Sequence, residues 1–214
     1  MERIYKIARN INLLKIKYGL NPVKVEGVKP KECFDYVFTK YDANDIIAIQ
    51  DKLKKEIETE AIEGIEANKL AFYAAVHATI EPYRKGFLES FNTSNWQRPE
   101  CPFCGRKAGL SQIGENGKRR LICHFCWTEW EYPRIKCFNC EKEASEYALF
   151  EVDRHEIRVD YCNSCKNYVK TVFFEFSDEP YVIWDLKTLS LDDWAISKGY
   201  KKPTPSLVGI DFTK

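Results

Sequence analysis

Four Cys-x-x-Cys pairs constrain the fold of this chain more than any other feature. They are Cys101 with Cys104, Cys123 with Cys126, Cys137 with Cys140, and Cys162 with Cys165, and they take up eight of the nine cysteines. A Cys-x-x-Cys turn places two thiolates on one side of the backbone, where they occupy two corners of a tetrahedron around a metal ion. Two turns complete one site, so the sequence predicts two sites of four thiolates each.

The segments between the pairs predict which pairs share a metal ion. The first two pairs flank two short strand-like runs around Asn116-Gly117, a dipeptide typical of hairpin turns. The last two pairs flank two alternating runs around Asp153, Arg154 and His155. Because a hairpin brings its ends together, each insert delivers its flanking pairs to one metal ion. The predicted ligands are Cys101, Cys104, Cys123 and Cys126 for site 1, and Cys137, Cys140, Cys162 and Cys165 for site 2.

Four thiolates close a tetrahedral site and leave no position for an activated water, so we expect structural or electron-transfer centres and no catalysis. Such sites suit zinc and iron alike; we expect zinc, with iron as the alternative. Redox dithiols fit less well, because a thioredoxin-type pair begins a helix within a βαβ unit and no such unit is indicated. His124 and His155 are not needed as ligands, and Cys33 has no ligand-like neighbour.

Residues 1–96 contain no cysteine pair and are predicted to form a helical domain. Apolar residues recur at helical spacing over about 3–18 and 44–65. A third helix carries an apolar and aromatic stripe that we interpret as core, with His77 as a packing residue inside it. The stripe comprises Phe72, Tyr73, Val76, Ile80, Tyr83 and Phe87. Residues 21–36 have the proline and glycine density of a loop.

After the helical domain, helical periodicity gives way to short alternating segments, which predicts an α+β chain with tandem rubredoxin-like or zinc-ribbon modules. We expect the first metal module over residues 97–132 and the second over 133–176. A C-terminal helix and tail over 177–214 are expected to pack on these modules. Asp185 is the predicted N-cap of that helix, and Gly199 is predicted to close it.

The bridge between the two sites is rich in aromatic and basic side chains. Such enrichment is typical of protein interfaces, so we predict Trp127, Trp130, Arg134 and Lys136 as partner-binding residues. The alternative is that the two tryptophans pack the two metal modules against each other.

Charge and hydropathy narrow the classes of partner. Residues 97–176 carry 13 lysines and arginines and 12 aspartates and glutamates. A divalent ion held by four thiolates adds a net charge of about −2, so the loaded region is negative, whereas a phosphate-binding module should be clearly positive. No apolar run approaches the ~20 residues that cross a bilayer, and charges interrupt the N-terminal segment. We therefore expect a cytoplasmic protein that binds neither nucleic acid nor membrane.

Several long motifs point to one family. They are CPFCG, RRLICHFCWTEWEYPRIKCFNC, DYCNSCKNYVK and DLKTLSLDDWAISKGY, and they include Thr128-Glu129-Trp130 and Tyr168-x-Lys170. From Cys101 to about Tyr200 the sequence thus resembles the formate dehydrogenase accessory protein family FdhE. The helical part, residues 1–96, is shorter than in typical members of that family.

The resemblance implies a non-catalytic, cytosolic maturation factor with a helical N-terminal domain and tandem rubredoxin-like modules. Its implied partner is the catalytic subunit of formate dehydrogenase or a related molybdenum- or tungsten-dependent enzyme. Two other functions share the cysteine pattern. One is a rubredoxin-like redox protein, and the other is a zinc-ribbon nucleic-acid-binding protein, which the charge disfavours.

Overall fold

The computed structural model describes residues 25, 29–38, 44, 47, 48, 51, 67–143, 146–174, 181–207 and 209–211. Contacts divide the chain into two compact units, which are described separately below: Met1–Asn92 with Phe103–Gly105, and Thr93–Pro102 with Arg106–Lys214. The predicted helix over 3–18 lies outside the described residues. Of the helix predicted over 44–65, Asn44, Ile47, Ala48 and Asp51 are described, and all four are helical.

The first unit contains two described helices, α2 (Cys33–Phe38) and α4 (Ala67–Ser90). In α4 the side chains of Val76, Ile80, Tyr83 and Phe87 are buried at three- and four-residue intervals. The part of the apolar stripe whose side chains are described is therefore core, as predicted. His77 is buried within the same helix.

The loop predicted over residues 21–36 is wrong at its end, because α2 begins at Cys33. Cys33 and Val37, four residues apart, are both fully buried and form the apolar face of this short helix. The proline and glycine signals end at Pro30, and from there burial of the two side chains favours a helix over a loop.

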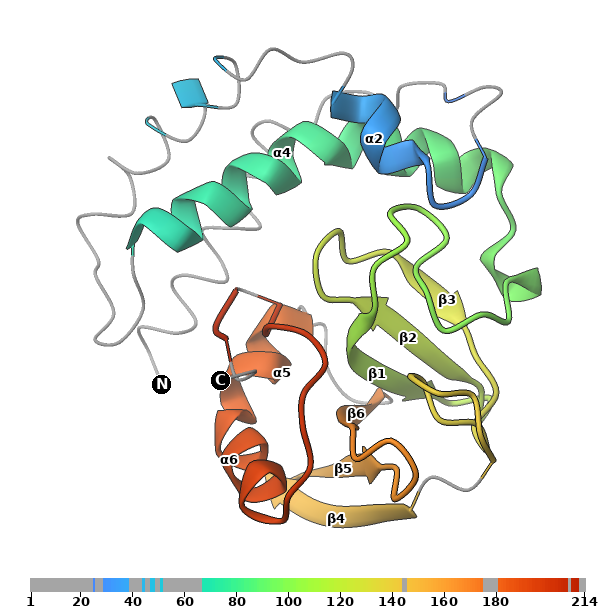
Figure 1. The fold of residues 1–214 in the computed structure, drawn as a ribbon, viewed down its shortest axis with the longest axis vertical. Helices are drawn as coiled ribbons and strands as arrows, with labels where there is room; N and C mark the ends of the chain where they lie inside the picture. Colours follow the sequence, from blue (N-terminus) through green and yellow to red (C-terminus); the bar gives the residue numbers. More distant parts are fainter. Residues whose placement is uncertain are drawn as a thin grey trace. The chain divides into compact units, whose positions relative to one another are not determined.

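The second unit is built on one six-stranded sheet with the strand order β3-β2-β1-β6-β5-β4 (Figure 1). In chain order the strands are β1 (Ala108–Gly114), β2 (Arg119–Cys123), β3 (Glu129–Glu131), β4 (Glu146–Val152), β5 (His155–Tyr161) and β6 (Tyr168–Phe174). β1 to β3 form one antiparallel ribbon and β4 to β6 form a second. Parallel pairing of β1 with β6 joins the two ribbons into one sheet.

Both predicted hairpins are confirmed. In the first turn Gly117 has a φ of +69°, and the Lys118 N–H donates to the side-chain oxygen of Asn116 at 3.0 Å. In the second turn Asp153 and Arg154 have φ values of +51° and +66°. Two successive positive φ values match the turn type whose twist suits a two-residue hairpin. Each ribbon therefore brings its two cysteine turns together.

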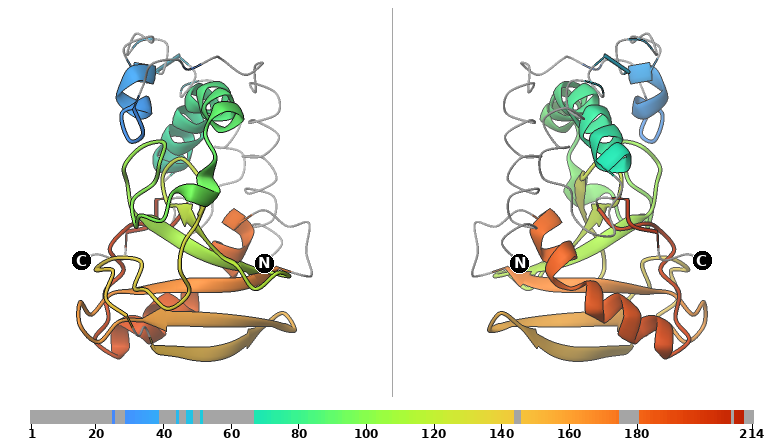
Figure 2. Two further views of the ribbon diagram at one scale, coloured as in Figure 1. Left: turned by 90° about the vertical axis from the view of Figure 1, so that its right-hand side faces the viewer. Right: turned by 90° about the vertical axis from the view of Figure 1, so that its left-hand side faces the viewer.

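Two helices, α5 (Tyr181–Lys187) and α6 (Leu189–Ser197), lie together on one side of the sheet (Figures 1 and 2). The prediction that Asp185 caps a helix is wrong, because Asp185 lies inside α5 with its side chain fully buried. The predicted closure at Gly199 is confirmed: Gly199 has a φ of +83°, and its N–H donates to the Ile196 carbonyl at 2.9 Å.

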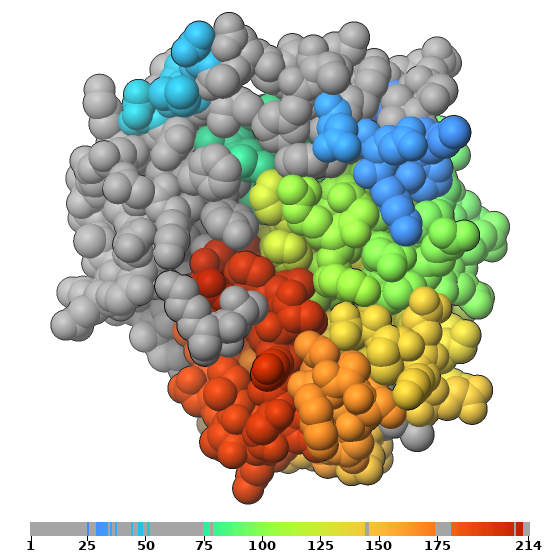
Figure 3. Space-filling model, viewed as in Figure 1, coloured from blue at the N-terminus to red at the C-terminus, as the bar shows by residue number. Residues whose placement is uncertain are grey.

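The chain after α6 runs along both ribbons. The Lys201 N–H donates to the Lys166 carbonyl at 2.7 Å, beside the last cysteine turn. Farther on, the Thr204 hydroxyl donates to the Ala108 carbonyl at 3.3 Å, at the start of β1. In Figure 3 the orange part of the chain lies directly against this red C-terminal segment. No helix among the described residues has the length and hydropathy needed to cross a membrane.

Candidate metal centres

The four Cys-x-x-Cys turns are closed by the same backbone hydrogen bond. In each turn the N–H of the first cysteine donates to the carbonyl oxygen five residues later, over 2.7 to 3.0 Å. The pairs are Cys101 with Arg106, Cys123 with Thr128, Cys137 with Lys142, and Cys162 with Asn167. The shared closure turns both thiols of each pair toward one point.

The residue after the second cysteine has a positive φ in all four turns. The values are +73° at Gly105, +56° at Trp127, +62° at Glu141 and +55° at Lys166. Only the first turn uses glycine, the residue that adopts this conformation without steric cost. The other three hold an ordinary side chain in the left-handed region, so the closed turn outweighs a local cost there.

The thiols of Cys101, Cys104, Cys123 and Cys126 converge in site 1 with all sulfur atoms within 4.8 Å of one another. The sulfurs of Cys101 and Cys126 are 3.5 Å apart. A tetrahedron with metal–sulfur distances of about 2.3 Å has edges of about 3.8 Å, so the spacing fits four ligands around one ion. The Phe125 N–H lies 3.4 Å from the Cys123 sulfur, where it stabilises a thiolate.

Site 2 has the same geometry. Cys137, Cys140, Cys162 and Cys165 form a second cluster with all sulfur atoms within 4.8 Å of one another. Cys137 and Cys165, and Cys140 and Cys162, are each 3.7 Å apart at sulfur. Burial raises the pKa of Cys137 and Cys140, whereas hydrogen bonds from Asn167 and Asn139 outweigh burial at Cys165 and bring its pKa down to about 7. The thiol is thereby prepared to bind a metal as thiolate.

The two predicted sets of four cysteines are thus brought together as two tetrahedral clusters. Neither spare histidine joins them. The Nδ1 of His155 lies 2.7 Å from the Asp153 carbonyl oxygen, and its ring packs at 4.8 Å against Trp184. His124 is half-buried, and desolvation is the main reason that its pKa falls to about 4. Among the residues that the structure describes, Cys33 belongs to no cluster.

Several known proteins are similar to this chain in sequence. No family model matches the chain. The FdhE homolog of Aquifex aeolicus is 30% identical over 159 residues, which are 68% of this chain and 54% of that protein. The FdhE homolog of Pseudomonas aeruginosa is 32% identical over 146 residues, 63% of this chain and 47% of that protein. Escherichia coli FdhE is 34% identical over 111 residues, 50% of this chain and 36% of that protein.

One solved structure is similar to this chain in fold. The crystal structure of the FdhE protein from Pseudomonas aeruginosa matches with a TM-score of 0.60 and 21% identity, covering 97% of this chain and 93% of that one. The chain is an FdhE-like protein. It spans about a third to a half of the length of the curated relatives named above.

The bridge residues of this FdhE-like chain divide into two kinds. Trp127 and Trp130 are buried, and their indole N–H groups donate to the carbonyl oxygens of Leu207 at 3.3 Å and Arg98 at 2.8 Å. These two hydrogen bonds tie the indoles to the C-terminal tail and to the segment before site 1, and neither of them joins the two metal modules. Arg134 is exposed and Lys136 is half-buried, so the prediction of a partner surface on the bridge now concerns these two side chains.

A buried charge cluster is the main feature of the FdhE-like fold that the sequence did not predict. Lys170 on β6 contacts Asp185 of α5 at 2.8 Å and Asp192 of α6 at 2.6 Å. Lys202 lies 3.4 Å from Asp185 and 3.1 Å from Asp192. All four side chains are almost fully buried. Two lysines and two aspartates balance, so the cluster is neutral as a whole.

The charge cluster is completed by hydrogen bonds. The Tyr168 hydroxyl donates to Asp192 at 2.8 Å, and the Leu207 N–H donates to Asp185 at 2.6 Å. Burial alone would raise the pKa of Asp185, but Lys170 and Lys202 lower it to about 2. Asp185 therefore stays ionised, and the contacts of the cluster tie β6, both helices and the C-terminal segment to one another. The signal for it was a lysine within an otherwise apolar strand, in the motif Tyr168-x-Lys170.

Proposed function

We propose that the chain is an accessory protein for the maturation of formate dehydrogenase or a related molybdenum- or tungsten-dependent enzyme. The observation that carries this proposal is the similarity to FdhE proteins in sequence, together with the fold of an FdhE protein. We place its activity in the cytoplasm, with the catalytic subunit of the client enzyme as partner. Accessory here means that the chain binds its client and carries out no chemical step on it.

The geometry of the two clusters supports a structural role for the metal ions and not a catalytic one. Each cluster supplies four thiolates, which fill a tetrahedron and leave no position for a substrate or a water. We propose zinc at both sites, where it would fix the two ribbons, as structural zinc does in small domains. We also propose that the chain is divided into a helical domain over 1–96, metal modules over 97–132 and 133–176, and a C-terminal helix and tail over 177–214.

Binding alone is sufficient to assist assembly. A protein that binds one conformation of an immature enzyme raises the population of that conformation by mass action. If this conformation accepts the enzyme's cofactor, the accessory protein promotes maturation without consuming anything. A rigid surface helps, because little conformational entropy is then lost on binding.

Co-purification and gene deletion test the proposal together. Tagged, metal-loaded full-length chain should recover an oxidoreductase catalytic subunit from its own cells, and deletion of its gene should abolish formate dehydrogenase activity while leaving the amount of client messenger RNA unchanged. A Cys33→Ser variant, which leaves both clusters intact, serves as the matched control and should restore activity. Recovery of no such subunit, with full activity in the deletion strain, contradicts the proposal.

A rubredoxin-like electron carrier is the second candidate. It is favoured by N–H groups that point at thiolate sulfur, such as Asn139 N–H at 3.4 Å from Cys137 Sγ, and by the half-buried Cys140 and Cys165 of site 2. Protein purified without oxygen and then oxidised distinguishes the two. An iron centre absorbs visible light and bleaches on reduction, whereas a colourless zinc protein carries no electron.

A further inference from the structure

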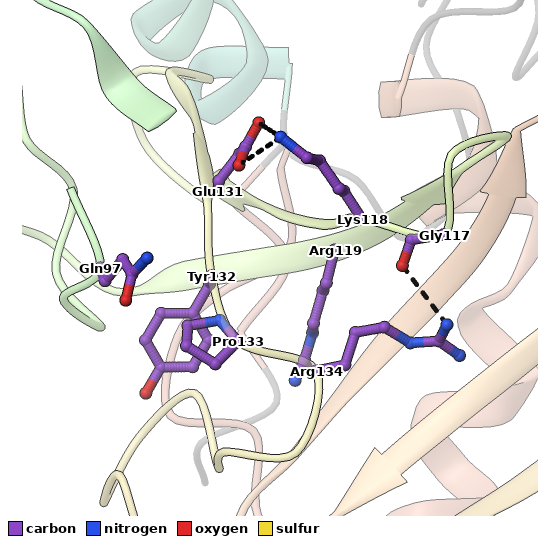
Figure 4. A pocket seen from close by; sticks show the side chains of 8 residues that line it. All are labelled: Gln97, Gly117, Lys118, Arg119, Glu131, Tyr132, Pro133 and Arg134. Carbon is purple, nitrogen blue, oxygen red and sulfur yellow. Dashed lines mark hydrogen bonds and ion pairs between the residues drawn. The ribbon is translucent and has the colours of Figure 1, made fainter. Parts of the chain in front are cut away.

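A pocket of about 430 Å³ lies where the first hairpin turn meets the bridge between the metal sites (Figure 4). It is lined by Gln97, Gly117, Lys118, Arg119, Glu131, Tyr132, Pro133 and Arg134. All of these residues belong to the second compact unit. The volume falls in the range of small-ligand sites, about 300–1,000 Å³.

The lining carries more positive than negative charge. Three cations and one carboxylate face the pocket. Glu131 is already bound by Lys118, whose ammonium lies 2.9 and 3.1 Å from its two oxygens. Arg134 is exposed, and its Nη1 donates to the Gly117 carbonyl at 3.3 Å (Figure 4). The carboxylate therefore offsets Lys118, and the charges of the two arginines are left for a ligand.

Two hydrogen bonds fix the orientation of the Arg119 side chain. Its side chain is buried, its Nε donates to the Ser111 hydroxyl at 2.9 Å, and its Nη1 donates to the Lys136 carbonyl at 3.2 Å. Its Nη2 makes no hydrogen bond within the part of the chain that the structure describes. Nη2 is closed to solvent and lies 3.7 Å from the buried Asp160, so Arg119 acts on a ligand in the pocket through its fixed positive charge and not through this donor.

The carboxylate of Asp160 is shared between the guanidinium groups of Arg119 and Arg158. Asp160 lies 3.7 Å from Arg119 Nη2, but it also binds Arg158 at 2.9 Å and accepts a hydrogen bond from the Thr171 hydroxyl. One carboxylate thus serves two guanidinium groups. The interior beside the pocket keeps an excess positive charge, which adds to that of Arg134 at the rim.

We propose that this pocket binds a carboxylate side chain on an acidic peptide segment, with the exposed Arg134 as the cation that contacts it and the buried charge of Arg119 adding to the attraction. Guanidinium groups match a planar carboxylate with two parallel hydrogen bonds. Tyr132 and Pro133 offer apolar surface and Gln97 an amide, which suits a peptide backbone beside the acidic side chain. That the segment belongs to the client enzyme rests on the proposed function.

The charge of the surrounding region favours a single carboxylate over a polyanion. With both metal sites loaded, the segment over residues 97–176 is negative, so it repels a long phosphate chain, whereas one acidic side chain needs only the local excess at the pocket. The pocket is therefore assigned to an acidic peptide and not to RNA or DNA.

Fluorescence anisotropy with defined probes tests the pocket directly. The metal-loaded full chain is titrated into a labelled peptide of glycine and serine with one central glutamate, and into the same peptide with glutamine in place of that glutamate. The glutamate peptide should bind at least about ten-fold more tightly, because charge-assisted hydrogen bonds depend on the carboxylate. Arg134→Gln should weaken its binding about five-fold or more, and 0.5 M NaCl should do the same.

Lys198→Gln is the matched control, because Lys198 is exposed directly after α6 and does not line the pocket. It should leave the affinity for the glutamate peptide unchanged. Arg119→Gln should reduce the preference for glutamate, because it removes the buried positive charge beside the pocket; Arg134→Gln, at an exposed position, keeps the test decisive if Arg119→Gln does not fold. Equal affinity for both peptides, or tighter binding of a labelled single-stranded RNA, overturns the inference.

The same variants separate this inference from the proposed function. If wild-type chain recovers the client subunit and Arg134→Gln recovers it equally well, while the peptide preference is absent, the pocket fails and the accessory role stands. If wild-type chain recovers no client but prefers the glutamate peptide, the accessory role fails and the carboxylate pocket stands.

Discussion

The two metal sites have the same turns and the same ligands but different surroundings. All four cysteines of site 1 are buried, whereas in site 2 Cys140 and Cys165 are only half-buried. The ribbons follow the same division. The interior of the first ribbon is apolar at Leu110, Leu121 and Ile122, while strand β4 at the edge of the second exposes apolar side chains.

The second ribbon, whose site 2 has two half-buried cysteines, also carries part of the buried charge cluster. Its strand β6 carries Tyr168 and Lys170 into the buried charge cluster, which also holds the C-terminal segment beside the last cysteine turn. The same cysteine turn therefore has two kinds of support, burial of all four cysteines in the first ribbon and a buried ionic network next to the second. The predictions below test that difference.

Loss of a ligand at site 1 should have the largest effect. Cys123→Ser should reduce the metal content from two ions to one and lower the free energy of unfolding by about 5 kcal/mol or more, because structural zinc contributes about 10–16 kcal/mol to small domains. Cys162→Ser at site 2 should cost less, since solvent and neighbouring groups reach that site. Metal analysis and denaturant titration measure both; Cys33→Ser should keep two ions.

Removal of Lys170 should have the next largest effect. Lys170→Met leaves Asp185 and Asp192 buried with one lysine between them, so the free energy of unfolding should fall by about 3–5 kcal/mol. The control is Lys166→Met, an exposed position on the preceding turn, where a change within about 0.5 kcal/mol is expected. Similar losses in the two variants would show that the charge cluster does not stabilise the second ribbon.

The cluster also predicts a pH dependence. The folded pKa of Asp185, about 2, lies below its ordinary value of 3.8, because the two lysines outweigh burial. The stability that this carboxylate contributes is then complete above about pH 4 and is lost as the pH falls through about 2. The carboxyl ¹³C signal of Asp185 should stay constant from pH 7 to 4. In Lys202→Met it should begin to titrate there, because its pKa rises.

Metal release should distinguish the two sites kinetically. When excess EDTA is added to the zinc-loaded chain, site 2 should lose its ion at least about ten-fold faster than site 1, because its half-buried cysteines become accessible by a smaller local opening. A chromophoric chelator should report two phases of one equivalent each. Cys140→Ser should remove the fast phase; a single phase containing both equivalents would show that the difference in burial does not matter.

The sequence was sufficient to predict which cysteines share a metal ion, because the signals that pair them lie close to them along the chain. A turn signal at Asn116-Gly117 and another at Asp153-Arg154 bring together cysteines that are close along the chain. Hairpins of this size need no distant partner to be recognised. The ligand pairing, both hairpins and the helix end at Gly199 were therefore predictable.

What the sequence did not predict depends on distant residues. The parallel pairing of β1 with β6 joins segments about sixty residues apart, and nothing in either strand identifies the other. Asp185 precedes Leu186 and Leu189 in the pattern of a helix cap, yet it is a buried partner of Lys170 and Lys202. A lysine in isolation is typical of the surface, and only its tertiary partners make it a core residue.

The smallest effect concerns the residue after each second cysteine. Gly105→Ala should lower the free energy of unfolding by about 1–2 kcal/mol, because a φ of +73° is unfavourable with a Cβ atom, which would lie 3.3 Å from the Cβ of Lys31. Glu141→Gly should raise it by about 0.5 kcal/mol or less, since relief at a φ of +62° is partly offset by the entropy of glycine in the unfolded chain. Denaturant titration with both metals bound measures the two changes. If Glu141→Gly were as destabilising as Gly105→Ala, the Glu141 side chain, and not the backbone shared with the first turn, would hold site 2 closed.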